Sequence, residues 1–219
     1  MSTVTPALVI FDCDGVLVDS DPIQNRMLTE AIVEAGLPIT YDEVCRDYTG
    51  GFMGDIVASV EAQLGRSLPE DWVPAFRART ADAFRRELRP VPGVERVLQQ
   101  LTEAKIPFCV GSNGPLEKSN LTLGITGLDT YFKDRIFSGW QVPRGKPAPD
   151  LYLHAAGVMG QPPSASVVIE DSVTGITAGI AAEMTTYGYV PNGDGRAQRL
   201  AGARVFRDMA ELPALLGLT

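Results

Sequence analysis

A short apolar run that ends in two aspartates constrains this chain more than any other feature. Residues 7–11 (Ala-Leu-Val-Ile-Phe) predict a buried β-strand, because aliphatic and β-branched residues bounded by a turn signal are typical of one. Asp12 and Asp14 follow, and on a near-extended chain their side chains point to one side while Cys13 points to the other. The two carboxylates repel each other, so they need a cation, a shared proton or water between them. Gly15 then permits a tight turn.

The rest of the chain divides into a helical block and an alternating block. Between Asp21 and Leu88 the apolar residues recur at helical spacing, and we expect helices without a convincing strand. At residues 89–93 (Arg-Pro-Val-Pro-Gly) two prolines and a glycine interrupt the chain. Helices and strands alternate after this point, which indicates a parallel sheet covered on both faces. The fold class is therefore α/β, with the helical block inserted after the first strand.

The expected elements follow from apolar periodicity and turn signals. Asp21 is expected to cap a helix that has Pro22 in its first turn and ends at Gly36. Two more helices of the block are expected over the apolar stripes of 56–64 and 72–88. In the alternating block we expect strands at 107–111, 135–138, 166–169, 185–190 and 204–206, and helices at 94–101, 116–123, 148–157, 173–182 and 209–216.

The composition excludes several classes of partner. A net charge of -8 over 219 residues and a pI near 4.7 argue against nucleic acid or an anionic membrane, which need a basic face. No apolar run approaches the ~20 residues of a membrane span, and the first residues lack the basic region of a secretory signal. Cys13, Cys45 and Cys109 are scattered without metal-site spacing, which fits reduced thiols. We therefore expect a cytoplasmic protein.

Polar residues follow three of the predicted strands, where a parallel sheet binds its ligands. Asp12 and Asp14 follow the first strand, Ser112-Asn113-Gly114 follow the second, and Glu170-Asp171-Ser172 follow the strand at 166–169. Because the carboxyl ends of parallel strands share one edge, these groups should meet there. Lys146, placed just before a predicted helix, is expected to join them.

This set of residues suits phosphoryl transfer. Carboxylate oxygens such as those of Asp12 and Asp171 are hard ligands that favour Mg²⁺ over zinc. A carboxylate beside a metal can attack phosphorus and form an aspartyl-phosphate, and a lysine can neutralise the phosphate. The Ser112 hydroxyl and the amides after it can hold phosphate oxygens. Asp14 is placed to protonate the leaving oxygen and then to activate water. Each motif alone is usually a turn, a surface lysine or a helix cap, but chance explains their occurrence in this order badly.

With these motifs in place, the chain resembles the haloacid dehalogenase-like (HAD) hydrolase superfamily over essentially its whole length. The segment 12–20 matches the first motif, Ser112 the second, Lys146 with Pro147 the third, and Glu170-Asp171-Ser172 the fourth. The resemblance implies a Rossmann-like catalytic core from residues 1–18 and 89–219. It also implies that residues 19–88 form a helical cap domain, which would close over the substrate, exclude water and read the leaving group.

The resemblance implies roles for particular residues. It makes Asp12 the nucleophile and Asp14 the general acid/base, and it makes Mg²⁺ the cofactor. The metal would be held by Asp12, the backbone carbonyl of Asp14 and Asp171, with Glu170 close by or ligating. The expected site is therefore catalytic Asp12, Asp14 and Lys146; substrate-binding Ser112, Asn113, Gly114 and Lys146; and metal-ligating Asp12, Asp14, Glu170 and Asp171.

Departures from the family patterns narrow the expected activity. In members that dehalogenate, the position of Asp14 is not an aspartate, so Asp14 favours phosphate esters. In the β-phosphoglucomutase-like branch a cap histidine assists catalysis and a cap arginine binds the second phosphate of the substrate. Here Gln24 stands at the histidine position, and no arginine occurs near residues 50–53. Both differences favour a phosphatase over a mutase. The runs 110–118, 137–139 and 146–150 are most similar to the 6-phosphogluconate phosphatase-like members. The only histidine, His154, lies in a predicted helix among alanines and is expected to be structural.

Three hypotheses of function follow. The leading one is a Mg²⁺-dependent phosphatase, a phosphoric monoester hydrolase, that acts on a small phosphorylated sugar or sugar acid such as 6-phosphogluconate. The second is a β-phosphoglucomutase-like phosphosugar mutase. The third is a non-enzymatic phosphoacceptor that resembles a two-component receiver domain, against which the long helical insertion argues. The expected partner is a small phosphorylated metabolite, with no nucleic acid or membrane, and the expected state is a monomer or weak homodimer.

Overall fold

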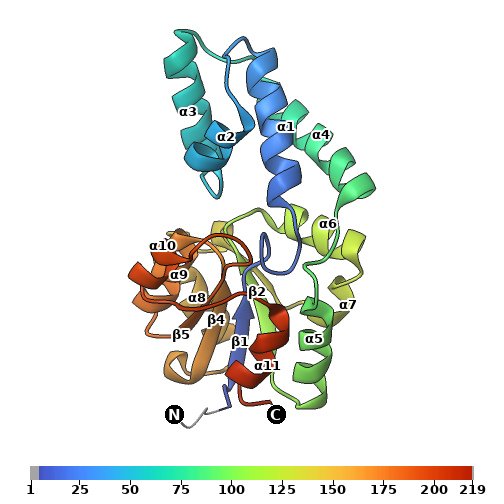
Figure 1. Cartoon of the computed structure of the whole chain (residues 1–219), viewed down its shortest axis with the longest axis vertical. Helices are drawn as coiled ribbons and strands as arrows, with labels where there is room; N and C mark the ends of the chain where they lie inside the picture. Colours follow the sequence, from blue (N-terminus) through green and yellow to red (C-terminus); the bar gives the residue numbers. More distant parts are fainter. Residues whose placement is uncertain (1–4, 219) are drawn as a thin grey trace. The chain divides into compact units, whose positions relative to one another are not determined.

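The computed structural model describes residues 5–218 of the protein (Figure 1). The chain forms two compact units. One comprises the chain up to Val18 together with the chain from Arg89 onward, and we call it the sheet unit. The other is Asp19–Leu88, which we call the helical unit.

The sheet unit is built on six parallel strands. They are β1 (Leu8–Phe11), β2 (Phe108–Ser112), β3 (Ile136–Ser138), β4 (Ser166–Glu170), β5 (Thr185–Tyr189) and β6 (Arg204–Phe206), in the spatial order β3-β2-β1-β4-β5-β6. β1 lies at the centre, with Val9 opposite Phe108 of β2 and Val167 of β4. This is the Rossmann-like order, which confirms the predicted α/β class.

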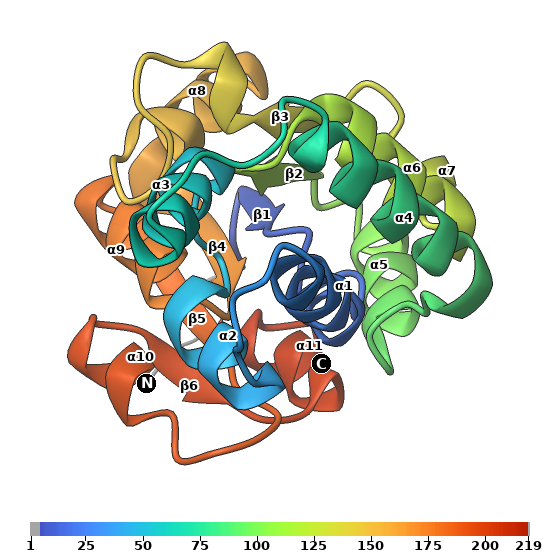
Figure 2. The same ribbon diagram turned by 90° about the horizontal axis from the view of Figure 1, so that it is seen from above.

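Helices cover both faces of the sheet, as Figure 2 shows from above. α8 (Asp150–Val158), α9 (Val173–Ala181) and α10 (Arg196–Leu200) lie on one side, and α5 (Val94–Glu103), α6 (Leu116–Thr126), α7 (Asp129–Phe132) and α11 (Leu212–Leu215) lie on the other. All four residues of β1 are buried, as are Tyr152 of α8 and Leu98 of α5. A strand with buried residues on both faces must be apolar throughout, which is why the run at 7–11 predicts it well.

The helical unit contains four helices and, within Asp19–Leu88, no strand, as predicted. The helices are α1 (Asp21–Glu34), α2 (Tyr41–Tyr48), α3 (Met53–Leu64) and α4 (Trp72–Glu87). α1 packs against α2 and α4. Ile32, Val44, Val60 and Phe84 are buried in this unit. The helical unit therefore has an apolar core of its own.

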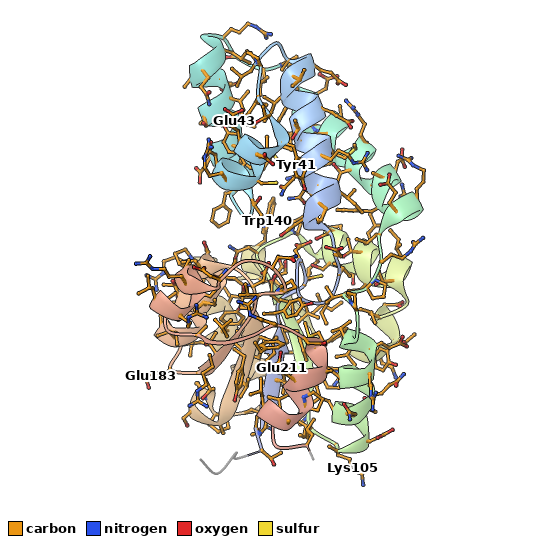
Figure 3. The ribbon with its side chains drawn as sticks, in the orientation of Figure 1. Tyr41, Glu43, Lys105, Trp140, Glu183 and Glu211 are labelled. Carbon is orange, nitrogen blue, oxygen red and sulfur yellow. The ribbon has the colours of Figure 1, made fainter. Side chains whose placement is uncertain are left out.

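Figure 3 labels residues at the carboxyl ends and at the amino ends of the strands. Trp140 lies on the 3₁₀ helix Gly139–Gln141 directly after β3, at the carboxyl edge, and is 69% exposed. Lys105 and Glu183 precede β2 and β5 at the amino edge and have φ values of 56° and 59°. Each follows a helix C-cap, and the backbone bonds Ile106 N to Leu101 O and Met184 N to Gly179 O close Schellman motifs there. These motifs direct α5 and α9 into the strands that follow.

Some predicted boundaries were wrong. Ser20, rather than Asp21, occupies the N-cap position of α1, and Asp21 is the first helical residue. Ser112 and Glu170 are the last residues of β2 and β4 instead of following them. The predicted helix at 209–216 is a 3₁₀ helix, Met209–Glu211, followed by α11, because Asp208 and Glu211 close a capping box over the tight turn. The sequence patterns did not predict α2, α7 or α10.

Two expectations from composition can be compared with the described residues. Among residues 5–218, no helix is long and apolar enough to cross a membrane. The thiols of Cys13, Cys45 and Cys109 are all free, which agrees with the expected reduced state.

Candidate active site

The sequence motifs meet at the carboxyl edge of the sheet. β1, β2 and β4 are neighbours at its centre, and Asp12, Asn113 and Asp171 follow their last residues. The strand order reverses at β1, since β2 and β3 lie on one side of it and β4, β5 and β6 on the other. Open α/β sheets bind their ligands beyond the carboxyl ends of the strands at such a switch point. The candidate site therefore lies where the first and fourth motifs come together.

Lys146 joins these two motifs through buried ion pairs. Its Nζ donates to Asp12 Oδ1 at 2.6 Å and to Glu170 Oε1 at 2.7 Å, and only 4% of its side chain is exposed. The pKa of Asp12 is raised to about 7, because burial raises it by more than the Lys146 ammonium lowers it. Burial lowers the pKa of Lys146, but the two carboxylates outweigh it and hold that pKa well above its usual value. Lys146 is therefore a protonated counter-ion shared by both motifs.

Glu170 is surrounded by hydrogen-bond donors. Its Oε1 accepts from Lys146 and, at 2.9 Å, from the hydroxyl of the buried Tyr152. Its Oε2 accepts from the amides of Asp171 and Ser172 at 3.0 Å and from the Ser172 hydroxyl at 2.9 Å. A carboxylate has about four lone-pair directions, so five donors occupy its capacity. The Glu170 carboxylate is therefore fully used by hydrogen bonds within the protein.

Two glycines make room for the acidic residues of the fourth motif. A Cβ on Gly15 would lie 2.2 Å from Asp171 Oδ2, and the φ of Gly15 is +73°, a conformation that suits glycine. A Cβ on Gly175 would lie 1.6 Å from Glu170 Oε1. Gln198 of α10 donates to the backbone carbonyl of Asp171 at 3.0 Å. The turn after β1 and the start of α9 thus leave room for the two carboxylates, and α10 holds the backbone of Asp171.

Three carboxylates could hold a divalent cation. Asp12, Glu170 and Asp171 each offer an oxygen, and these oxygens all lie within 4.8 Å of one another. The Lys146 ammonium pairs with Asp12 and Glu170, and a cation bound among the three carboxylates would reduce their mutual repulsion. All the donors are hard carboxylate oxygens, which Mg²⁺ prefers. The residues present therefore fit a Mg²⁺ ion.

The Asp14 carboxylate pairs with Lys118 of α6 instead of joining that cluster. Lys118 Nζ lies 3.0 Å from both Asp14 Oδ1 and Asp14 Oδ2. About a quarter of each side chain is exposed, 24% for Lys118 and 23% for Asp14. Asp14 is therefore more accessible to solvent than Glu170, whose side chain is fully buried.

The second motif forms a tight turn at the end of β2. Ser112 is 2% exposed, and its Oγ accepts from the amide of Gly114 at 3.1 Å. Because Oγ is the acceptor there, its own O–H can donate to another group. The Ser138 hydroxyl of β3 donates to the Gly114 carbonyl at 2.6 Å and ties the turn to the next strand. The Asn113 side chain bonds to the main chain of Lys146.

Sequence reasoning missed three residues of this arrangement. The apolar pattern places Tyr152 on the buried face of its helix; the available signal was that a buried tyrosine hydroxyl needs a partner. Lys118 lies inside a run that resembles family members, but nothing in its spacing indicates a pairing with Asp14. Gln198 lies on α10, which the sequence did not predict. The His154 ring packs edge-on against the Phe137 ring, with 5.6 Å between the ring centroids, in keeping with a structural role.

Comparison with known proteins gives the family. A model of the haloacid dehalogenase-like hydrolases matches residues 6–183. The chain is 32% identical to 6-phosphogluconate phosphatase of Escherichia coli (strain K12) over 208 residues. This aligned region covers 94% of this chain and 93% of the relative. The chain is 31% identical over 188 residues to hexitol phosphatase B of the same organism, which covers 84% of each.

Solved structures agree with this relationship. A HAD family hydrolase from Deinococcus radiodurans R1, solved with bound phosphate and sodium, superposes with a TM-score of 0.81 at 35% identity over 98% of this chain and 97% of that one. A putative β-phosphoglucomutase from Thermotoga maritima superposes with a TM-score of 0.80 at 28% identity over 96% and 98%. The chain belongs to the haloacid dehalogenase-like hydrolase family. The expected resemblance is confirmed, and the relatives named as phosphatases agree with the predicted phosphoric monoester hydrolase.

Proposed function

We propose that the protein is a Mg²⁺-dependent phosphatase that hydrolyses a small phosphorylated sugar or sugar acid through a phosphorylated Asp12. The observation that carries the proposal is the buried Asp12 carboxylate, held by Lys146 at 2.6 Å beside the oxygens of Glu170 and Asp171. A carboxylate in such a place can act as a nucleophile only if the charge of the incoming phosphate is balanced, and an ammonium and a cation site lie next to it.

The reaction divides into two displacements at phosphorus. In the first, an Asp12 oxygen forms a bond to phosphorus while the bond from phosphorus to the sugar oxygen breaks, and Asp14 gives that oxygen a proton. In the second, Asp14 takes a proton from water, the water oxygen bonds to phosphorus, and the Asp12 carboxylate leaves. The sum is phosphate ester plus water giving alcohol plus inorganic phosphate. Ser112 and the amides after it hold the phosphate oxygens in both steps.

The metal site belongs to the same proposal. Asp12, Asp171 and the backbone carbonyl of Asp14 would hold Mg²⁺, and Glu170 would support the site through Lys146. When bound, the ion neutralises charge on the transferred phosphoryl group. Because the Glu170 carboxylate already accepts five hydrogen bonds, we infer that it holds Lys146 in place and does not ligate the metal itself.

The substrate class rests on the relatives. Two of them are named for phosphorylated sugar acids or sugar alcohols, and a similar structure holds bound phosphate. We infer that the helical unit, Asp19–Leu88, is a cap that selects the leaving group. The free thiols of all three cysteines support a cytoplasmic location.

Phosphate release tests the proposal. The protein is assayed with sugar phosphates, sugar-acid phosphates and nucleotides, with Mg²⁺ and with EDTA. We expect metal-dependent release, greatest with a phosphorylated sugar or sugar acid, and a loss of about 10³-fold or more in Asp12→Asn, as for other covalent nucleophiles. Asp134→Asn, which changes an exposed aspartate of the sheet unit, is the matched control and should retain activity. Full activity in Asp12→Asn would refute the mechanism, and isomer formation without net phosphate release would indicate a mutase.

A further inference from the structure

The side chain of Asn113 bonds to the main chain of Lys146 through both of its polar atoms. Nδ2 donates to the Lys146 carbonyl at 3.1 Å, and Oδ1 accepts from the Lys146 amide at 2.8 Å. The two residues are 33 positions apart in the chain. A side-chain amide can pair with a peptide in this two-bond manner because it carries one acceptor and donors side by side. Asn113 therefore fixes both the position and the orientation of the Lys146 backbone.

Two glycines enclose this amide. A Cβ on Gly145 would lie 2.7 Å from Asn113 Oδ1, and a Cβ on Gly139 would lie 2.8 Å from the same atom. Gly139 follows β3, and Gly145 immediately precedes Lys146. The Asn113 amide thus sits where the end of β2, the end of β3 and the Lys146 loop come together. A longer side chain at position 113 would not fit the same space.

The ammonium of Lys146 depends on this anchor. Nζ must reach Asp12 at 2.6 Å and Glu170 at 2.7 Å at the same time, although Asp12 follows β1 and Glu170 ends β4. The lysine precedes α8 on a loop that includes no strand of its own. Fixing the backbone at one end and the ammonium at the other leaves the long side chain little freedom, and reactive groups lose rate steeply when they shift by about 1 Å.

We propose that Asn113 is a positioning residue that places Lys146 against Asp12, and that its side chain does not bind the substrate. The inference rests on the proposed function for its effect on turnover. The sequence predicts Asn113 as a substrate-binding residue, and its main-chain amide stays compatible with that prediction. The side-chain amide is used instead to hold the lysine loop.

A double-mutant cycle tests whether Asn113 acts through Lys146. Asn113→Ala, Lys146→Met and the double variant are compared in kcat and in the affinity for inorganic phosphate with Mg²⁺. We expect Asn113→Ala to lower kcat by about 10- to 100-fold, and the double variant to be no worse than Lys146→Met alone. Asn120→Ala, at an exposed position of α6, is the control and should behave as wild type. Losses that multiply in the double variant, or a change confined to KM, would overturn the proposal.

A second pair of variants tests the clamp itself. Gly145→Ala should lower kcat by a factor similar to that of Asn113→Ala, because its Cβ displaces the amide. The three atoms that this Cβ would meet first all belong to the Asn113 side chain, at 2.7, 3.4 and 3.6 Å. In the Asn113→Ala background these atoms are gone, so Gly145→Ala should then have no further effect. A Gly145→Ala loss of the same size in both backgrounds would contradict the clamp.

The two readouts separate this inference from the proposed function. If wild type releases no phosphate from any ester, the proposed function fails. The cycle is then decided by the affinity for inorganic phosphate, in which equal values for Lys146→Met and the double variant support positioning and additive losses oppose it. If wild type is active and the cycle is additive, the positioning role alone fails.

Discussion

Replacing Lys146 by methionine would show how strongly the buried charges contribute to stability. The variant keeps an unbranched side chain but removes the ammonium that pairs with Asp12 at 2.6 Å and Glu170 at 2.7 Å. The Glu170 side chain is fully buried and that of Asp12 is 11% exposed, so water cannot replace the lost partner. Removing one partner of a buried ion pair costs about 3–5 kcal/mol. For a chain of this length, that loss in the free energy of unfolding corresponds to about 6–20 °C in Tm.

The loss should increase with pH. Burial raises the pKa of Asp12 from 3.8 to about 7 in the folded protein. The folded state then binds a proton more tightly than the unfolded state, so this group favours folding at low pH, and the contribution is lost as the pH rises toward 7. Lys146 lowers the pKa of Asp12, so its removal raises that pKa further and extends the loss of stability above pH 7. The difference between Lys146→Met and wild type should be larger at about pH 8.5 than at about pH 6.

Urea unfolding followed by circular dichroism in EDTA measures this difference. Lys105→Met, at an exposed lysine on the amino edge of the sheet, is the control and should change the free energy of unfolding by less than about 0.5 kcal/mol. Adding Glu170→Gln to Lys146→Met should recover part of the loss, because one stranded charge is removed. A loss below about 1 kcal/mol at the higher pH, the value typical of exposed pairs, would refute the reasoning, as would a loss that shrinks with pH.

Two further predictions concern the turn after β1 and the thiols. Gly15→Ala should weaken Mg²⁺ binding, measured by calorimetry, and abolish phosphate release, because its Cβ would lie 2.2 Å from Asp171 Oδ2 at a φ of +73°; unchanged Mg²⁺ affinity would contradict the assigned site. Burial raises the pKa of Cys109 to about 12 and that of Cys13 well above its usual value, so iodoacetamide at about pH 8 should label neither thiol until urea is added. Rapid labelling of either one in the native protein, counted by mass spectrometry, would be the opposing result.

The strands and the longer helices were predictable because burial leaves a strong pattern in them. β1 and β4 are buried along their whole length, and α5 buries one face, so continuous or periodic apolar residues mark each element. α10 has no buried residue and therefore no stripe to read. The sequence patterns did not predict α2, although Thr40 and Glu43 form a capping box at its start. Only two residues of α2 are buried, and two residues are too few to give a periodic apolar pattern.

The location of the site at the carboxyl edge of the sheet was predictable, but the side-chain contacts within it were not. The rule that parallel strands end at one edge brings Asp12 and Glu170 together without any knowledge of their side chains. The pairing of Lys118 with Asp14 spans 104 residues and depends on how α6 lies against the turn after β1, which no local pattern encodes. The Asn113 contact with the Lys146 backbone also depends on the approach of two loops, where Gly139 and Gly145 leave room for the amide.

The central place of β1 also affects how the chain is made. β1 is synthesised first, yet its neighbours in the sheet begin only at Phe108 and Ser166. At ~5–20 residues per second, translation of the ~100 residues before β2 takes roughly 5–20 s. During that time the contiguous helical unit can fold, whereas the apolar strand β1 has no neighbouring strand on either side. A nascent or truncated product that stops before β4 keeps one of those edges open, and such an edge is a site of aggregation.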